Sequence, residues 1–304
     1  MLDVRILREL HVESPTGAGG VESLSSASGL VRSGDGVFVV ADDEHHLARF
    51  EVSGDRPGRR IPLFDGALPG AHEARKAVKP DCESLVLLPP FGAFPCGALL
   101  ALGSGSRSTR YRAALLGLDA AGAAVGAARI VDFAAVFESL NESLGVPNIE
   151  GAFIRGDALC LLHRGNGTNA FDAVVEFGWP VVREWLVGRG PAPGPATIVR
   201  MSLGAIDGVP LNFTDGAALP DGGWVFSAAA EDTADSYQDG RCTGSAIGRV
   251  DASGGIVSIE RVGLDCKIEG VAASVTSSGI ELLMVTDADD RGRPSLLLGA
   301  SLPF

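Results

Sequence analysis

The sequence predicts an all-β protein, a five-bladed β-propeller with four-stranded blades. Short apolar runs alternate with glycine-rich turns along the chain, which has 41 glycines in 304 residues. Five segments of similar composition each open an apolar run, about 60 residues apart. The last of the five units is one strand short, and the chain begins with a strand that can complete it. Such closure leaves no open sheet edge in the ring.

Each repeated segment places a serine, aspartate or glutamate before a small residue and then an apolar one. We call this first residue the anchor of its unit. The anchors are Ser28, Glu83, Glu150, Asp215 and Glu269. Their spacings of 55, 67, 65 and 54 residues indicate repeated supersecondary units. A sixth blade would need another anchor and shorter units, and two stacked sandwiches would not explain an anchor at the start of every unit.

The predicted blades lie within a single domain of residues 1–304 and follow the anchors in order. Their approximate bounds are 26–66, 81–131, 148–204, 213–263 and 267–304, with strand 2–8 added to the last blade. In the first unit strands are expected at 28–31, 36–41, 46–52 and 60–64, and in the second at 83–88, 97–102, 113–119 and 128–131. In the third unit they are expected at 150–154, 158–163, 173–177 and 197–203, and in the fourth at 215–219, 223–228, 246–251 and 257–262. The fifth unit has three, at 269–274, 280–286 and 295–300.

Two segments between blades break the strand pattern. Apolar residues in 132–145 recur with helical spacing, and Gly145 and Pro147 are stop signals. A shorter helix is expected within 68–79, before Pro80. The Gly- and Pro-rich stretch 188–195 is expected to form an extended loop in the third unit.

Composition limits the classes of partner. The formal net charge of −13 disfavours nucleic acid and anionic membranes as partners of the whole surface. No run approaches the roughly 18 apolar residues that span a bilayer, and residues 1–5 lack the apolar stretch of a signal peptide. The five cysteines lack metal-ligand spacing, and the three within or beside apolar runs are expected to be buried thiols. We expect a cytoplasmic monomer, with secretion left open if a leader precedes the sequence.

The anchors begin the innermost strands, which line the channel of a propeller. We therefore expect the five anchor side chains to form one ring facing the axis. Carboxylates gathered in a narrow channel raise one another's pKa unless a cation compensates them. Because the donors are all oxygens, the sequence predicts Ca²⁺, with Mg²⁺ as second choice. The alternative is that these side chains cap strands and bind channel water or backbone N–H groups.

Unusual polar residues gather in loops on the same face as the anchors. The cationic side chains there could hold a small anionic ligand beside the metal. These candidate substrate-binding residues are Lys76, Lys79, Arg107, Arg110, Arg164 and Lys267. The candidate catalytic residues are Glu150, which could accept a proton from water, and His163, at a strand end. The alternative is that the cations are solvated loop charges and that His163 is an ordinary loop histidine.

The pattern of one inner-strand residue per blade resembles the calcium-activated nucleotidases, or soluble apyrases. The resemblance implies a five-bladed propeller with a central calcium held by Ser and Glu side chains. Ser28, Glu83, Glu150 and Glu269 match that pattern, whereas Asp215 departs from it because the family usually has Ser there. The segment 79–85, Lys-Pro-Asp-Cys-Glu-Ser-Leu, also resembles uncharacterised bacterial propellers, some labelled phytase-like. The phytase-like comparison implies six blades, which the period of the anchors contradicts.

Two functions are compatible with these observations. One is a metal-dependent hydrolase of phosphate esters or anhydrides, in which the metal polarises a phosphoryl oxygen. The other is a non-catalytic propeller in which the ion is structural and the loop face binds a small molecule or a protein. Fold alone does not separate them.

Overall fold

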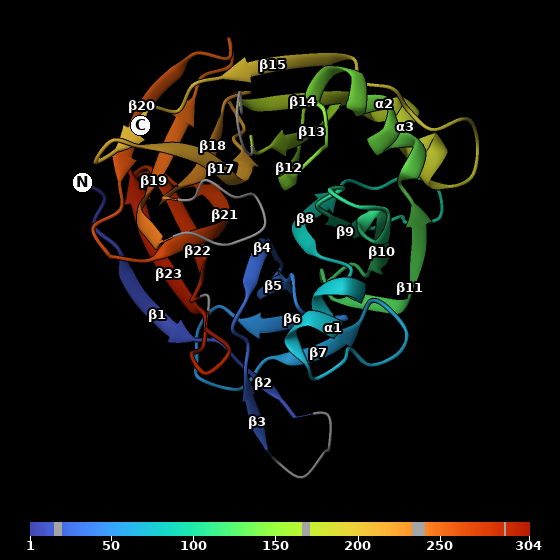
Figure 1. Cartoon of the computed structure of the whole chain (residues 1–304), viewed down its shortest axis with the longest axis horizontal. Helices are drawn as coiled ribbons and strands as arrows, with labels where there is room; N and C mark the ends of the chain where they lie inside the picture. Colours follow the sequence, from blue (N-terminus) through green and yellow to red (C-terminus); the bar gives the residue numbers. More distant parts are fainter. Residues whose placement is uncertain (15–19, 166–170, 233–240, 289) are drawn as a thin grey trace.

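The computed structural model confirms the five-bladed β-propeller (Figure 1). It describes residues 1–14, 20–165, 171–232, 241–288 and 290–304. Strands are given from the inside of each blade outward. Blade one contains β4 (Ala27–Ser33), β5 (Gly36–Ala41), β6 (His46–Glu51) and β7 (Arg59–Pro62). Blade two contains β8 (Cys82–Leu88), β9 (Ala98–Gly103), β10 (Arg112–Leu118) and β11 (Ala124–Asp132), and blade three contains β12 (Ile149–Arg155), β13 (Ala158–His163), β14 (Asp172–Gly178) and β15 (Thr197–Met201).

The last two blades have the same antiparallel order. Blade four contains β17 (Val209–Ala218), β18 (Trp224–Asp232), β19 (Arg241–Val250) and β20 (Ile256–Arg261), and β16 (Ala205–Ile206) pairs with β17. Blade five contains β21 (Lys267–Val275), β22 (Ile280–Asp287) and β23 (Leu296–Leu302). The strand β1 (Arg5–Glu9) pairs antiparallel with β23 as the fourth strand of blade five. The predicted closure of the ring by the N-terminal strand is therefore confirmed.

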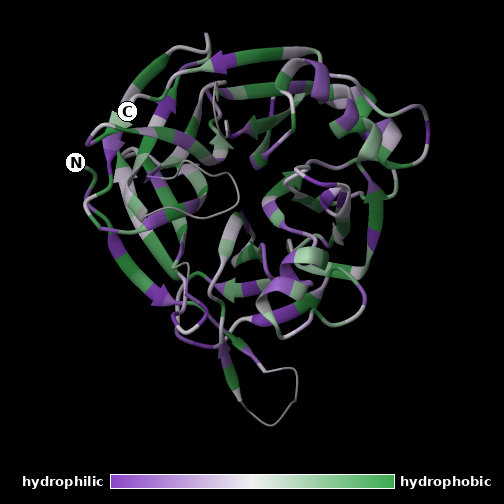
Figure 2. Ribbon diagram, viewed as in Figure 1, coloured by the Kyte–Doolittle hydropathy of each residue, from purple (hydrophilic) through white to green (hydrophobic). Residues whose placement is uncertain are grey.

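The hydrophobic core is divided into layers between neighbouring blades. For example, Phe38 of blade one packs in one cluster with Leu85 of blade two, and Phe153 of blade three packs in another with Trp224 of blade four. Middle strands have a neighbouring blade on each face, so β5 and β9 are buried along their whole length. This explains their near-continuous apolar sequences (Figure 2).

Two helices, α1 (His72–Val78) and α2 (Ala134–Leu144), connect consecutive blades and confirm the two predicted helices. The inner face of α2 is buried through Val136, Phe137 and Leu140. Three elements were not expected from the sequence. They are α3 (Trp179–Leu186), the short strand β16, and the hairpin of β2 (His11–Glu13) with β3 (Val21–Ser23). No helix of the described segments is long and apolar enough to span a membrane.

Candidate metal and ligand site at the mouth of the channel

Each innermost strand contains a register shift typical of a β-bulge, near the start of the strand in all but β17. Glu83, Glu150 and Glu269 are the extra residues of bulges in β8, β12 and β21, because the residues on either side of each pair with consecutive residues of the next strand. Ser28 lies in the corresponding register shift of β4. A bulge re-aims a side chain and leaves its backbone outside the ladder. The repeated anchor of the sequence is thus a repeated bulge at the end of the channel that we call the top.

The fourth blade departs from this pattern by one residue. Its extra residue is Thr214, and Asp215 pairs with Ser227 as an ordinary ladder residue. Asp215 lies instead at the level of Gly151, where an added Cβ would come within 2.6 Å of the Asp215 Cα. The register therefore places Thr214, rather than Asp215, at the level of the other four anchors.

Asp215 occupies the seam between two blades. Its side chain is buried, and Oδ2 accepts a hydrogen bond of 3.0 Å from the backbone N–H of Val271 in β21. Burial raises the pKa of Asp215 well above its usual range, although backbone N–H groups, that of Val271 among them, oppose the shift. Asp215 therefore links the innermost strands β17 and β21.

A first group of buried charges joins blades one and two. The ammonium of Lys79 lies 3.1 Å from Asp81 Oδ1 and also contacts Asp42. Arg110 Nη1 lies 2.7 Å from Asp81 Oδ2. Burial alone would lower the pKa of Lys79, but the carboxylates of Asp42 and Asp81 outweigh burial and raise it. Asp81 is thus neutralised by two cations.

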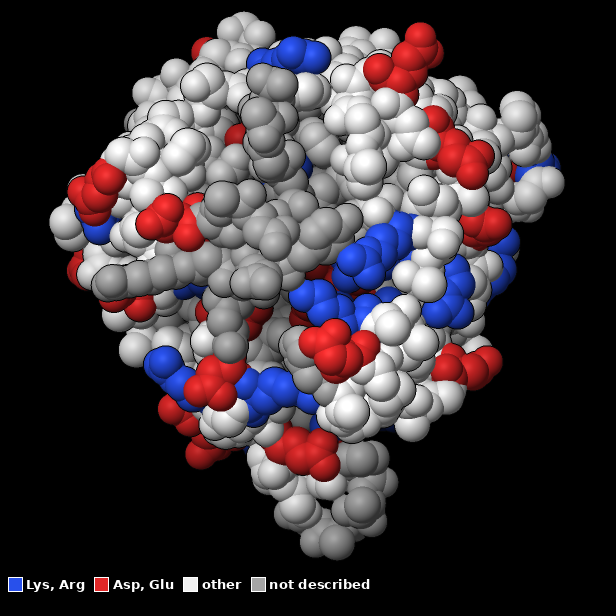
Figure 3. All heavy atoms as spheres, viewed as in Figure 1, with Lys and Arg blue, Asp and Glu red and all other residues white. Residues whose placement is uncertain are grey.

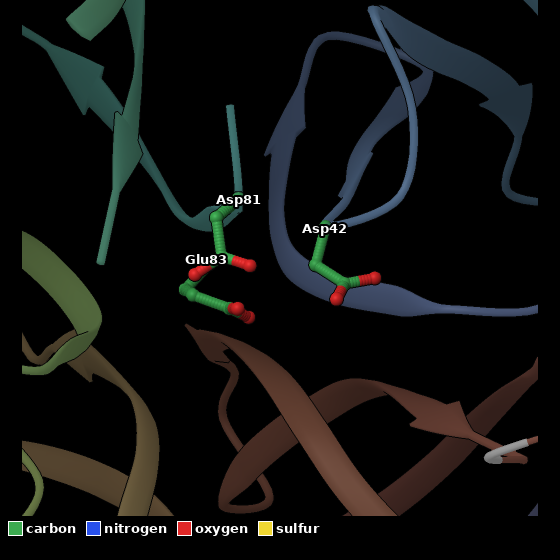
Figure 4. A group of neighbouring side chains, drawn as sticks. All are labelled: Asp42, Asp81 and Glu83. Carbon is green, nitrogen blue, oxygen red and sulfur yellow. The ribbon is translucent and has the colours of Figure 1, made fainter. Parts of the chain in front are cut away.

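Glu83 lies beside this group without sharing its ion pairs. Within the described ranges, no hydrogen bond or ion pair reaches its carboxylate. Burial, followed by the negative charges of Asp81 and Glu150, raises the pKa of Glu83 well above its usual range. One oxygen each of Asp42, Asp81 and Glu83 lies within 4.8 Å of the others (Figure 4). Asp42 Oδ1 is buried and has no hydrogen-bond partner.

A second group of buried charges joins blades three, four and five. Lys267 Nζ lies 2.8 Å from an oxygen of Glu231 and 2.8 Å from one of Glu269. Arg164 also contacts Glu231, and its Nη1 lies 3.9 Å from Glu150 Oε2. These cations hold the pKa of Glu231 below its usual range against the opposing effect of burial. Two cations thus face three carboxylates, and burial raises the pKa of Glu269 although Lys267 and Arg164 oppose the shift.

Glu150 and His163, the candidate catalytic residues, are both buried near the second group. Burial raises the pKa of Glu150 to about 7, and Arg164 opposes the shift. Burial lowers the pKa of His163 to about 4, so the imidazole is neutral at pH 7. His163 Nδ1 accepts a hydrogen bond of 3.1 Å from the Asn148 backbone N–H, which leaves the proton on Nε2.

The predicted substrate-binding cations divide into two sets. Lys79, Arg164 and Lys267 are buried and bound to carboxylates. Arg110 is half-buried on Asp81, Lys76 is half-buried, and Arg107 is exposed. Figure 3 shows Lys and Arg atoms gathered beside the centre of this face, with acidic atoms between them.

Sequence reasoning missed three acids that complete these groups. Asp42 follows β5, Glu231 lies near the end of β18, and Asp81 precedes Glu83 by two residues. Asp42 and Glu231 thus share one position, the upper end of the second strand of a blade. That shared position is a signal available in the sequence once the strands are assigned.

The fold and this site define a five-bladed β-propeller with buried, mostly paired charges at one end of its channel. The chain belongs to the family described as "Family of unknown function (DUF6929)", whose model matches residues 23–302. No curated protein matches the sequence.

Solved structures share the fold at low identity. The glutaminyl cyclase of Myxococcus xanthus is 10% identical, with a TM-score of 0.50 over 99% of this chain and 97% of that one. The bifunctional GH43-CE protein of Bacteroides eggerthii is 12% identical, with a TM-score of 0.52 over 95% of this chain and 34% of that one. At these identities the likeness shows the fold alone.

Proposed function

We propose that this propeller binds a divalent cation at the top of its channel through Asp42, Asp81 and Glu83, and a small anionic ligand beside it. The observation that carries the proposal is the environment of Glu83, a carboxylate among carboxylates that no described donor reaches. The buried Asp42 Oδ1 lacks a partner as well. An all-oxygen donor set suits Ca²⁺ first and Mg²⁺ second.

The three carboxylates fit such an ion, although the Lys79 ammonium also contacts Asp42 and Asp81. Lys79 and Arg110 take up the charges of Asp42 and Asp81 but form no ion pair with Glu83. A cation beside Glu83 would supply the missing compensation. Of the five ligands predicted from the sequence, this proposal keeps Glu83. Glu150 and Glu269 face protein cations, Asp215 bonds across a seam, and the Ser28 hydroxyl donates a hydrogen bond to the Ser26 carbonyl.

The test compares two glutamates at equivalent bulges. Calorimetry with Ca²⁺, and the melting temperature with and without millimolar Ca²⁺, should show binding and stabilisation in the wild-type protein. Glu83→Gln should abolish both effects, whereas Glu269→Gln, which alters a carboxylate already paired with Lys267, should retain them. Absence of Ca²⁺ and Mg²⁺ binding to the wild-type protein would refute the proposal.

A second candidate function is hydrolysis of a phosphate ester or anhydride, as the resemblance to calcium-activated nucleotidases implies. The observation that favours it is Glu150, which is buried next to Arg164 and has a pKa near neutrality. A carboxylate with such a pKa can accept a proton from water at pH 7, and a guanidinium can hold phosphate oxygens. A cation beside Glu83 would polarise a phosphoryl oxygen when bound.

This second function is tested by phosphate release from nucleotides and sugar phosphates in the presence of Ca²⁺ or Mg²⁺. Glu150→Gln should abolish release while Ca²⁺ binding, measured separately, persists. Cation binding without turnover of any substrate would instead assign the protein as a non-catalytic binding propeller with a channel ion.

A further inference from the structure

The opposite, lower end of the channel is lined mostly by apolar side chains. A cavity of about 230 Å³ lies there, lined by residues of all five innermost strands. Its lining includes Leu30, Leu87, Phe153, Ala217 and Val271. Glu83 and Leu87 lie near opposite ends of β8, so the cavity is separate from the charged groups at the top. Aliphatic and aromatic side chains of this kind can pack against the apolar part of a ligand.

A second cavity adjoins the first in the seam between blades five and one. It measures about 220 Å³ and shares Arg32, Ala272 and Ala273 with the channel cavity. Arg5, on the strand that closes the ring, also lines it. Arg32 therefore borders both cavities, and Arg5 borders the second.

The guanidinium groups of Arg5 and Arg32 are available to a ligand. Both side chains are exposed, and in the described part of the chain neither has a hydrogen bond or ion pair. Among the described residues that line the seam cavity, the one acid is Glu281, which accepts a hydrogen bond of 2.8 Å from Ser301. Unpaired cations beside an apolar hollow stand out on a protein of net charge −13.

We propose that this lower hollow binds a small amphipathic monocarboxylate. Its carboxylate pairs with Arg32 and Arg5, as guanidinium groups favour carboxylates in a bidentate arrangement. Its hydrocarbon part lies along the apolar walls of the channel cavity. The size of each cavity, below the roughly 300–1,000 Å³ typical of drug-sized ligands, favours a short chain or a single ring.

Calorimetry with butanoate, hexanoate and octanoate tests the proposal. Each added methylene that enters the cavity should tighten Kd about fourfold, until the cavity is full. The matching primary alcohols should bind at least about tenfold more weakly than the acids, because they lack the charge. Arg32→Ala and Arg5→Ala should each weaken octanoate binding, whereas Arg261→Ala, at an exposed arginine of the outer strand β20, should leave it unchanged.

A variant that fills the cavity provides an independent check. Ala273→Phe places a ring where the two cavities meet and should abolish octanoate binding, with the circular dichroism spectrum and melting temperature confirming the fold. No saturable binding of any acid, alcohols binding as tightly as acids, or full binding in Arg32→Ala would each overturn the proposal. Because none of these outcomes depends on Ca²⁺, they are distinct from failure of the cation site at the top.

Discussion

The buried carboxylate of Asp215 accepts a hydrogen bond of 3.0 Å from the backbone N–H of Val271 in the next blade. In the described sheets, innermost strands of different blades share no hydrogen-bonded ladder, so a side chain can satisfy a backbone polar group along a seam. Asp172 has a similar position between blades three and four, where Oδ1 accepts a 3.0 Å hydrogen bond from the Phe213 N–H. These two aspartates tie the fourth blade to both of its neighbours.

Replacement of Asp215 by alanine should destabilise the protein by about 1–3 kcal/mol, because the buried N–H of Val271 loses its acceptor. Replacement by asparagine should cost much less, since an amide oxygen can accept the same bond and no charge is buried. Since burial raises the pKa of Asp215, Asp215→Asn should be at least as stable as the wild type at pH 8. Urea denaturation of both variants measures the difference, and equal losses for alanine and asparagine would contradict the hydrogen-bond role.

The approach of Gly151 to Asp215 leads to a second prediction. Because a Cβ at this position would lie 2.6 Å from the Asp215 Cα, Gly151→Ala must push two innermost strands apart. We expect a loss of about 2 kcal/mol or more in the free energy of unfolding. Gly194 is the control, since an added Cβ there meets no atom within 4 Å. Gly194→Ala should change stability by less than about 0.5 kcal/mol, and a similar loss in both variants would argue against the close packing.

The blade pattern was predictable because it depends on local composition repeated at a long period. Glu83, Glu150 and Glu269 were identified together, since each precedes a small residue and an apolar strand. In the fourth blade the same reasoning placed Asp215 one residue away from the bulge, because Asp215-Gly216 imitates Glu150-Gly151. The position of a bulge depends on the pairing of two strands, which one strand's composition does not fix.

The charge pairs could not be predicted from the sequence, for a different reason. Lys79 meets Asp42 across the seam between blades one and two, and Lys267 meets Glu231 between blades four and five. These contacts join residues that are far apart in the chain and on different blades. The prediction of a metal ring was based on repulsion between the acids, and the sequence alone does not assign buried cations to them.

The pairing of Arg164 with Glu231 gives a third prediction. Both side chains are buried, so Arg164→Met would leave the Glu231 carboxylate with only Lys267. Breaking a buried ion pair by removing one partner costs about 3–5 kcal/mol. The exposed pair of Arg261 with Asp207 is the control, and Arg261→Met should cost less than about 1 kcal/mol. Thermal and urea denaturation measure both, and comparable effects would mean that Arg164 is not structural.

The last prediction concerns Asp172, whose pKa is raised to about 7 by burial, against the opposing effect of the Phe213 N–H. Between pH 4 and pH 7 the folded protein keeps a proton on Asp172 that the unfolded chain releases. The stability from this group is therefore present below pH 4 and is lost as pH rises to about 7, by up to about 1.4 kcal/mol per pH unit. Asp172→Asn should remove this slope from the curve of unfolding free energy against pH.

Asp251→Asn is the matched control, because side-chain and backbone hydrogen bonds lower the pKa of the exposed Asp251 and its titration lies below this window. Its curve between pH 5 and pH 8 should run parallel to that of the wild type. Other buried acids, Glu150 among them, titrate in the same range, so the informative quantity is the difference between wild type and Asp172→Asn. If the difference in unfolding free energy between wild type and Asp172→Asn stays constant from pH 5 to pH 8, Asp172 is ionised throughout. The N–H groups around Asp172 would then have a larger effect on its pKa than burial.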